Sequence, residues 1–171
     1  HATVDGRPLT PVEQKSFFSN MISAGNETTR SSLAGAIWGL GHHPDQRRLL
    51  LDAPALIPPA IHELLRWFSP VYQMARTATR DVDVGGTRIR AGERVAMLYG
   101  AGNHDPAIFA DPHRLDLGRA NAQRHLAFGY GVHHCLGWRL AVLQLRLILE
   151  AFLTAFPDYA LAAEPTYVRS N

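Results

Sequence analysis

The stretch Phe-Gly-Tyr-Gly-Val-His-His-Cys-Leu-Gly, residues 128–137, carries more information than any other part of the chain. Its glycines let a backbone approach a flat ligand closely, because glycine has no Cβ. Cys135, the only cysteine, is expected at the start of a helix over about 136–156. The free N–H groups and positive partial charge of a helix N-terminus favour a thiolate over a thiol. A thiolate is the form that binds metal, so Cys135 is a candidate ligand.

Three uses of this thiolate compete with the plain role of a small buried apolar residue. A zinc site needs four ligands. His133, His134 and Cys135 are adjacent, but the sequence has no second Cys and no His-x-x-x-His pair that would complete a set of four. A nucleophilic cysteine needs a positioned base; the histidines can supply one, but no peptidase signature surrounds them. A haem thiolate needs one protein ligand, a glycine loop and a cation for the propionates, and it accounts for more of the residues.

The pattern Phe128-x-x-Gly131-x-His133-x-Cys135-x-Gly137 resembles the haem-binding loop of the cytochrome P450 family, bacterial soluble type. The resemblance implies that Cys135 is the axial ligand of the iron of haem b (iron protoporphyrin IX). It further implies that His133 hydrogen-bonds a haem propionate, and that Phe128, Gly131 and Gly137 belong to the cofactor-binding loop.

Residues 24–29, Ala-Gly-Asn-Glu-Thr-Thr, resemble the oxygen-activating segment of the same family and fall within a long expected helix. Gly25 would let ligand and oxygen lie against the helix. Thr28 can turn its hydroxyl into the helix groove or toward oxygen, and Glu27 can relay protons from water. Alone, Glu-Thr-Thr on a helix is more often a solvated face; the cysteine loop downstream favours Glu27 and Thr28 as catalytic residues.

The resemblance also assigns roles outside these two segments. Arg76, entering the first strand, is implied to pair with a haem propionate, which suits a guanidinium. Glu63 and Arg66 are implied to form a buried pair with a third residue, for which Arg114 is the candidate; these three are structural. His125 matches bacterial members of the family, but a satisfied loop histidine is at least as good an interpretation.

Hydrophobic periodicity and the Pro and Gly breaks predict the elements. The helices expected are a capped helix of about 30 residues ending before Pro44, a short helix to about Leu51, a helix over about 59–68, and a final helix over about 136–156. Between the third and the last helix we expect a β-hairpin over 76–89 that turns at Gly85-Gly86, a strand over 95–99 and an irregular stretch over 100–124. In the final helix, Leu140, Leu143, Leu147 and Leu149 are expected to face inward. The order predicts a mainly α fold with a small β-sheet. The resemblance makes this a partial cytochrome P450 fold, from the long central helix through the haem-loop helix.

The bulk composition suits one globular domain, with 46% hydrophobic and 19% charged residues. A net charge of +2 gives little support to nucleic-acid binding. No apolar run approaches the ~20 residues of a membrane span, and no signal-peptide pattern opens the chain, so a cytoplasmic location is expected. The resemblance implies that residues 1–171 are the carboxy-terminal haem-binding part of one domain whose amino-terminal half is absent.

The resemblance implies a haem-dependent monooxygenase that inserts one atom of O2 into an apolar organic substrate with electrons from a redox partner. No flavin or nicotinamide glycine motif is visible, so a separate, ferredoxin-type donor is expected. Residues 24–30 resemble bacterial members that oxidise steroids, terpenes and fatty acids, although the sequence does not specify the substrate. A truncated, non-catalytic haem-binding fragment is the alternative; a peroxide-driven enzyme is disfavoured by Glu27 and Thr28.

Overall fold

The computed structural model describes residues 3–166 and is mainly helical with small two-stranded sheets, as predicted. The helices are α1 Pro11–His42, α2 Pro44–Asp52, α3 Ile57–Phe68, α4 Tyr99–Gly102 and α5 Trp138–Ala155, with 3-10 turns η1 Pro54–Leu56, η2 Ala122–Arg124 and η3 Gly131–His133. The strands are β1 Thr3–Val4, β2 Arg7–Pro8, β3 Gln73–Thr77, β4 Val82–Val84, β5 Thr87–Ile89 and β6 Arg94–Leu98. None of the helices within these residues combines the length and the hydropathy needed to cross a membrane.

The long helix α1 is defined at both ends by local sequence. The Thr10 side chain accepts a hydrogen bond from the Glu13 N–H, and the Glu13 carboxylate accepts one from the Thr10 N–H at 2.8 Å. This capping box satisfies N–H groups that a helix start leaves unpaired. Pro44 ends the helix after His42, because proline disfavours helical backbone in the residue before it. The predicted length and cap of α1 are confirmed.

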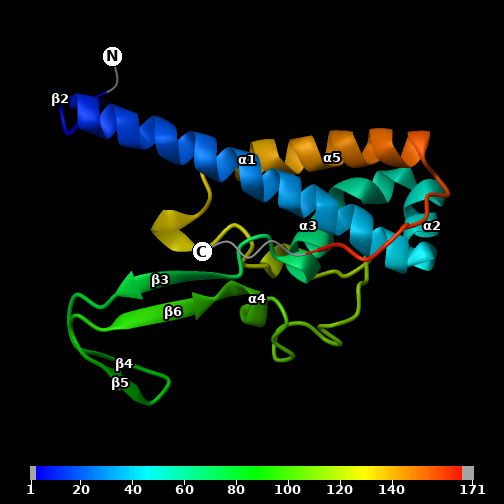
Figure 1. Cartoon of the computed structure of the whole chain (residues 1–171). Coiled ribbons are helices and arrows are strands. Elements are labelled where there is room, and N and C mark those ends of the chain that lie inside the picture. Colours follow the sequence, from blue (N-terminus) through cyan, green and yellow to red (C-terminus); the bar gives the residue numbers. More distant parts are fainter. Residues whose placement is uncertain (1–2, 167–171) are drawn as a thin grey trace.

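Only the carboxy-terminal half of α1 packs against the rest of the protein. Its buried residues begin at Ser32, whereas Phe17, Phe18, Met21 and Ile22 are exposed. In the packed half, a Cβ at Gly35 would overlap the ring of Phe68 at the end of α3. The glycine therefore allows α1 and α3 to approach closely, while the amino-terminal half of α1 projects away from the body of the protein (Figure 1).

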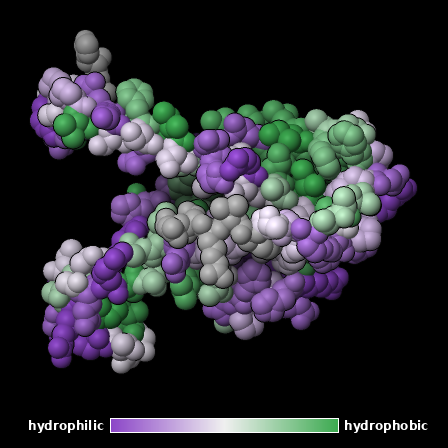
Figure 2. Space-filling view, viewed as in Figure 1, coloured by the Kyte–Doolittle hydropathy of each residue, from purple (hydrophilic) through white to green (hydrophobic). Residues whose placement is uncertain are grey.

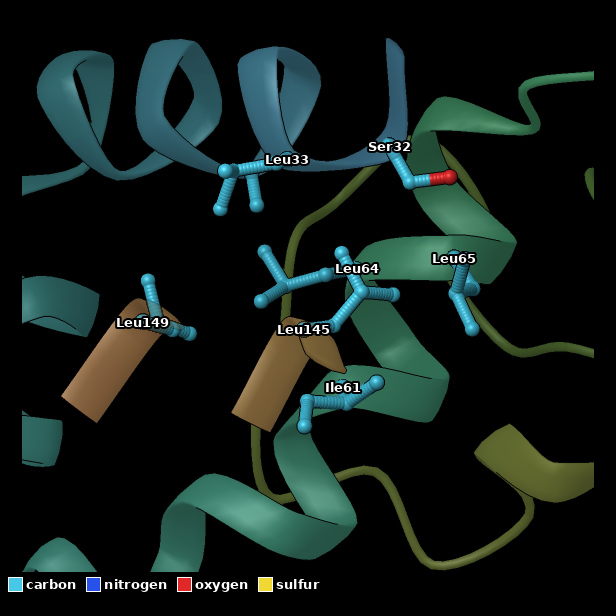
Figure 3. Close-up of a pocket in the computed structure, with 8 residues that line it drawn as sticks. Ser32, Leu33, Ile61, Leu64, Leu65, Leu145 and Leu149 are labelled. Carbon is cyan, nitrogen blue, oxygen red and sulfur yellow. The ribbon is translucent and has the colours of Figure 1, made fainter. Parts of the chain in front are cut away.

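The core lies where α1, α3 and α5 meet (Figure 1). Figure 3 shows leucines of α5 converging with Ile61 and Leu64 of α3 beneath α1. The space between them is about 10 Å³, which is near the minimum for one water molecule, and its lining is apolar except for Ser32, whose hydroxyl already donates to the Thr28 carbonyl. This cavity is a packing gap of the core, not a ligand site.

The inward face of α5 differs from the prediction. Leu145, Leu149 and Leu153 are buried, so the expectation is right for Leu149. It is wrong for Leu140, Leu143 and Leu147, which are 46–60% exposed. The helix is apolar on two sides, and periodicity alone does not say which side meets α1 and α3. The helix also begins at Trp138, about two residues later than expected.

The described strands form three separate antiparallel pairs, of which β1–β2 is the short one before α1. β4 and β5 make the predicted hairpin, and its turn glycines, Gly85 and Gly86, both have positive φ. β3 does not join this hairpin as expected; it pairs with β6 in a register that sets Arg76 opposite Val95. The β3–β6 pair extends below the projecting half of α1 (Figure 1).

Candidate functional site

Cys135 sits at the end of a tight loop closed by three backbone hydrogen bonds. Its own N–H donates to the Phe128 carbonyl at 2.8 Å, the Gly129 N–H donates to Leu126 at 2.8 Å, and the His134 N–H donates to Gly131 at 3.0 Å. Gly129 and Gly131 have φ of 69° and 67°, a region that side chains with a Cβ rarely adopt. The two glycines therefore let residues 128–135, the cysteine loop, fold back on itself.

The expected place of Cys135 at a helix start needs correction. Gly137 is the cap of α5, and Cys135 lies two residues before that cap, where its carbonyl accepts a 3.4 Å hydrogen bond from the Trp138 N–H. The turn over 135–138 separates the thiol from the first helical residue. Cys135 is a free, partly buried thiol held by the loop rather than by the helix.

A deep notch separates the amino-terminal half of α1, residues 11–27, from the β3–β6 pair (Figure 2). In the view of Figure 1, the η3 turn of the cysteine loop lies between α1 and β3 at the closed end of this notch. Val132 of the loop and Leu136, which directly follows it, are at least 80% exposed. Large apolar side chains with so little cover mark a surface suited to a hydrophobic ligand.

The residues around the loop fit a haem group. An added Cβ at Gly25, Gly131 or Gly137 would meet no atom within 4 Å, so the backbone at each position borders open space. Within residues 3–166 no group of three or more side chains is placed to hold a metal ion. A single thiol beside open space is the donor set of a metal whose other ligands come from a macrocycle.

Two cationic candidates for the propionates, Arg76 and His133, are exposed. The Arg76 guanidinium donates to the Ala75 carbonyl at 2.9 Å, and no carboxylate of residues 3–166 pairs with it. In the same described range the His133 ring has no hydrogen bond or ion pair. Both side chains are therefore available to a carboxylate ligand.

Glu27 is the last residue of the projecting half of α1, and Thr28, which follows it, is partly buried. The Glu27 carboxylate pairs with Arg30 at 2.6 Å, and this hydrogen bond lowers the pKa of Glu27. The Thr28 hydroxyl donates to the Ala24 carbonyl at 2.6 Å, inside the helix groove as expected. No hydrogen bond or ion pair described for residues 3–166 joins either residue to the cysteine loop, so α1 and the loop contribute to the candidate site from separate elements.

The Glu63–Arg66 pair is completely buried and supports the segment that precedes the cysteine loop. Arg66 donates to Glu63 at 2.7 and 2.8 Å and to the carbonyls of Asn103 and Pro112. The third side chain of the network is Arg119, whose Nε lies 3.1 Å from the Glu63 carboxylate. The expectation for Arg114 was wrong: its side chain is exposed, and only its carbonyl takes part.

His125 is a satisfied loop histidine, the alternative that the sequence left open. Its Nδ1 accepts a 3.1 Å hydrogen bond from the Ala127 N–H, and its Nε2 lies 3.2 Å from Nδ1 of His62 on α3. An accepting Nδ1 places the ring proton on Nε2, which then donates to His62. Burial, with smaller contributions from nearby cations, holds the pKa of His125 down to about 4.

Sequence reasoning missed Asn103 and the partner histidine of His125. Asn103 is fully buried and joins α3 to the lead of the cysteine loop. Its only sequence signal is its place in an Asn-His-Asp-Pro stretch, which is typical of a turn. His62 gave no signal, because a single histidine in a helix does not reveal what it faces.

A mainly α fold, a partly buried cysteine in a loop and open space at the neighbouring glycines are the features expected of a haem-binding protein. The sequence model of the cytochrome P450 family matches residues 55–157. The chain belongs to the cytochrome P450 family, whose members bind haem.

Individual relatives agree. The chain is 41% identical over 167 residues to the putative cytochrome P450 126 of Mycobacterium tuberculosis, covering 98% of this chain and 40% of the relative. It is 42% identical over 161 residues to the steroid C26-monooxygenase of that species, covering 94% of this chain and 40% of the relative. Among solved structures, CYP109E1 from Bacillus megaterium in complex with testosterone superposes with a TM-score of 0.91 at 31% identity, over 99% of this chain and 47% of that one. The chain spans about 40% of the length of the curated relatives it matches.

Proposed function

We propose that the whole protein is a haem-dependent monooxygenase, which inserts one atom of O2 into an apolar organic substrate with electrons from a redox partner. The observation that carries the proposal is the position of Cys135. Its thiol ends a loop that two positive-φ glycines fold, and the backbone at Gly131 and Gly137 on either side of it borders open space. Residues 1–171 would be the carboxy-terminal haem-binding part of a single domain.

The cofactor proposed for this site is haem b. Cys135 would be the axial ligand of its iron, and His133 and Arg76 would bind its propionates, because both are exposed and face no competing carboxylate in the described chain. Phe128, Gly131 and Gly137 would border the macrocycle on the loop side, and Gly25 on the α1 side. When bound, the haem supplies oxygen binding and activation, which a thiolate ligand promotes by donating electron density.

Glu27 and Thr28 would manage protons on the α1 side. Glu27 is exposed and ionised at neutral pH, because Arg30 lowers its pKa, so it can take protons from water and pass them on. The Thr28 proton is already donated to Ala24, which leaves the hydroxyl oxygen free to accept a hydrogen bond from a group in the notch. Glu27 would therefore be the residue that moves the proton, and Thr28 would position a water molecule by accepting a hydrogen bond from it.

The substrate class proposed is a small lipid, steroid or terpene-like molecule. The apolar side chains exposed on the projecting half of α1 suit such a ligand: they are Phe17, Phe18, Met21 and Ile22. A 40% identical relative is the methyl-branched lipid omega-hydroxylase of Mycobacterium tuberculosis, and another is named a steroid C26-monooxygenase. We further propose a separate ferredoxin-type protein as the electron donor and a cytoplasmic location.

The ferrous–CO difference spectrum of the haem-loaded protein tests the assignment of Cys135. The wild type should show a thiolate-type band, and Cys135→Ala should abolish it. His134→Ala is the matched control, since it removes the neighbouring metal-binding side chain and should leave the band in place. A thiolate-type band in Cys135→Ala would refute the proposal. Haem binding without hydroxylation of lipids or steroids in a ferredoxin-driven assay would favour a non-catalytic fragment instead.

A further inference from the structure

Asn103 follows α4 and is completely buried, and it uses every polar group it has. Its Nδ2 donates to the Ser69 hydroxyl at 2.7 Å, and its Oδ1 accepts from the Leu126 N–H at 2.6 Å. Its backbone carbonyl accepts from Arg66 at 2.7 Å, and its N–H donates to Tyr99 at 2.9 Å. A buried amide whose oxygen and NH2 group are both hydrogen-bonded is held near one geometry, because turning it over would leave buried polar groups unpaired.

The direction of the carboxamide is fixed by its neighbours. Ser69 caps the end of α3, and its hydroxyl donates to the Arg66 carbonyl at 3.0 Å. The Ser69 oxygen can therefore only accept from Asn103, which identifies the nearer amide atom as the NH2 group. The carboxamide oxygen must then face the Leu126 N–H, where the short hydrogen bond is found.

Leu126 begins the segment that becomes the cysteine loop. Its carbonyl accepts from the Gly129 N–H, and two residues later the Phe128 carbonyl accepts from the Cys135 N–H at 2.8 Å. A continuous path of hydrogen bonds and short backbone links thus runs from the end of α3 through Asn103 to Cys135. The α3 end of this path is immobilised by the buried Glu63–Arg66 pair.

We propose that Asn103 is a positioning residue for the iron ligand: its carboxamide clamps the entry of the cysteine loop to the end of α3 and so sets where the Cys135 sulfur lies. The proposal rests on the proposed role of Cys135 as the ligand. Asn103 itself touches neither the thiol nor the open space beside it. Its effect is transmitted through Leu126 and Phe128.

The test replaces Asn103 with leucine, which has a similar size but no hydrogen-bonding group, in the haem-loaded protein. Two quantities are measured: the fraction of thiolate-type band in the ferrous–CO spectrum, and the hydrogen-exchange rate of the Leu126 amide. We expect Asn103→Leu to lower the thiolate fraction at least threefold and to raise the exchange rate at least tenfold. Asn121→Leu is the matched control, since Asn121 also donates within the irregular stretch, to the Ile108 carbonyl at 2.7 Å, but has no bond to the loop.

Equal thiolate fractions in the Asn103→Leu and Asn121→Leu proteins would overturn the proposal, even if both lose thermal stability. If Asn103→Leu does not fold, Ser69→Ala removes the partner of the amide NH2, together with the Ser69 hydrogen bond to the Arg66 carbonyl, and leaves the Asn103 carboxamide in place. Ser69→Ala should still raise the exchange rate of the Leu126 amide and lower the thiolate fraction. If neither quantity changes, the proposed positioning role of Asn103 is wrong. A wild-type protein without a thiolate band would instead refute the role of Cys135, whereas faster Leu126 exchange in Asn103→Leu would still be observed.

Discussion

The backbone N–H of Cys135 donates to the carbonyl of Phe128 at 2.8 Å, seven residues earlier in the chain. This bond closes the cysteine loop and ties the thiol to a segment anchored in the core. It also brings the Phe128 ring within 5.4 Å of His125, measured between ring centroids. The position of the candidate ligand therefore depends on the segments that hold the loop, and substitutions at Gly129, Arg119 and His125 test this dependence.

Gly129→Ala should destabilise the loop and weaken haem retention. Gly129 has φ of 69°, where an alanine costs about 1–2 kcal/mol. An added Cβ would also lie 3.4 Å from the His133 carbonyl. Gly118→Ala is the control, because Gly118 has no positive φ and its added Cβ would meet only an ordinary contact. Thermal unfolding and the haem absorbance per protein measure both effects; equal behaviour of the two variants would contradict this account of the loop.

Arg119→Met should destabilise the protein far more than Arg114→Met. The Arg119 guanidinium is 7% exposed and lies 3.1 Å from Glu63, so its loss leaves a buried carboxylate with one fewer cation. Removing a partner from such a buried pair costs about 3–5 kcal/mol. The Arg114 side chain is exposed, and its carbonyl survives the substitution, so a change within about 0.5 kcal/mol is expected. The unfolding free energies of both variants, measured with denaturant, show which arginine stabilises the buried Glu63–Arg66 pair.

Acid should destabilise the protein through His125. Its pKa is about 4 in the folded protein because of burial, against an ordinary value near 6.5 in the unfolded chain. Between these values the unfolded state binds more protons, so stability is full above pH 6.5 and falls as pH decreases toward 4. The loss attributable to His125 is up to about 3 kcal/mol. Protonation also converts the accepting Nδ1 into a donor facing the Ala127 N–H.

His125→Asn provides the comparison for this pH dependence. An asparagine side chain can accept from the N–H two residues later but does not titrate. The slope of unfolding free energy against pH between 4 and 6.5 should therefore become shallower in this variant. A slope identical to that of the wild type would assign the acid sensitivity to another group.

Glu27→Gln should slow substrate hydroxylation without removing the haem. The amide cannot carry a proton, and loss of a proton-transfer group typically lowers a rate about 10²–10⁴-fold. Arg30→Gln separates this effect from the loss of the ion pair, because it breaks the same pair at 2.6 Å but keeps the carboxylate. The rate of product formation measures hydroxylation, and the haem content shows whether the cofactor is retained. If Glu27→Gln hydroxylates substrate as fast as Arg30→Gln does, Glu27 does not transfer the proton.

Local signals in the sequence predicted the local structure well. The Thr10–Glu13 box, the end of α1 before Pro44 and the Gly85-Gly86 turn each depend on residues close in sequence, and the structure confirms them. The resemblance to cytochromes P450 is confirmed for the fold and the family, and the site residues stay predictions.

Tertiary contacts were less predictable. The prediction of Arg114 as the third residue was wrong because the irregular stretch folds back so that the side chain of Arg119 reaches Glu63 instead. The prediction of the inward face of α5 was wrong for three of its four leucines because leucines lie on both sides of that helix. Asn103 was missed because its partners, Ser69 and Leu126, lie 34 and 23 residues away. A buried amide shows its importance only once these distant segments are placed.

Because α1 and α3 approach closely at Gly35, that glycine affects the position of both helices that border the candidate site. α1 carries the proposed proton pair, and α3 carries the arginine and serine that hold Asn103. A side chain at position 35 would push against the Phe68 ring, the last residue of α3, and tilt one helix relative to the other. In the proposed site, the spacing between the helix that carries Glu27 and the segment that carries Cys135 would thus depend on the absence of one methyl group in the interior.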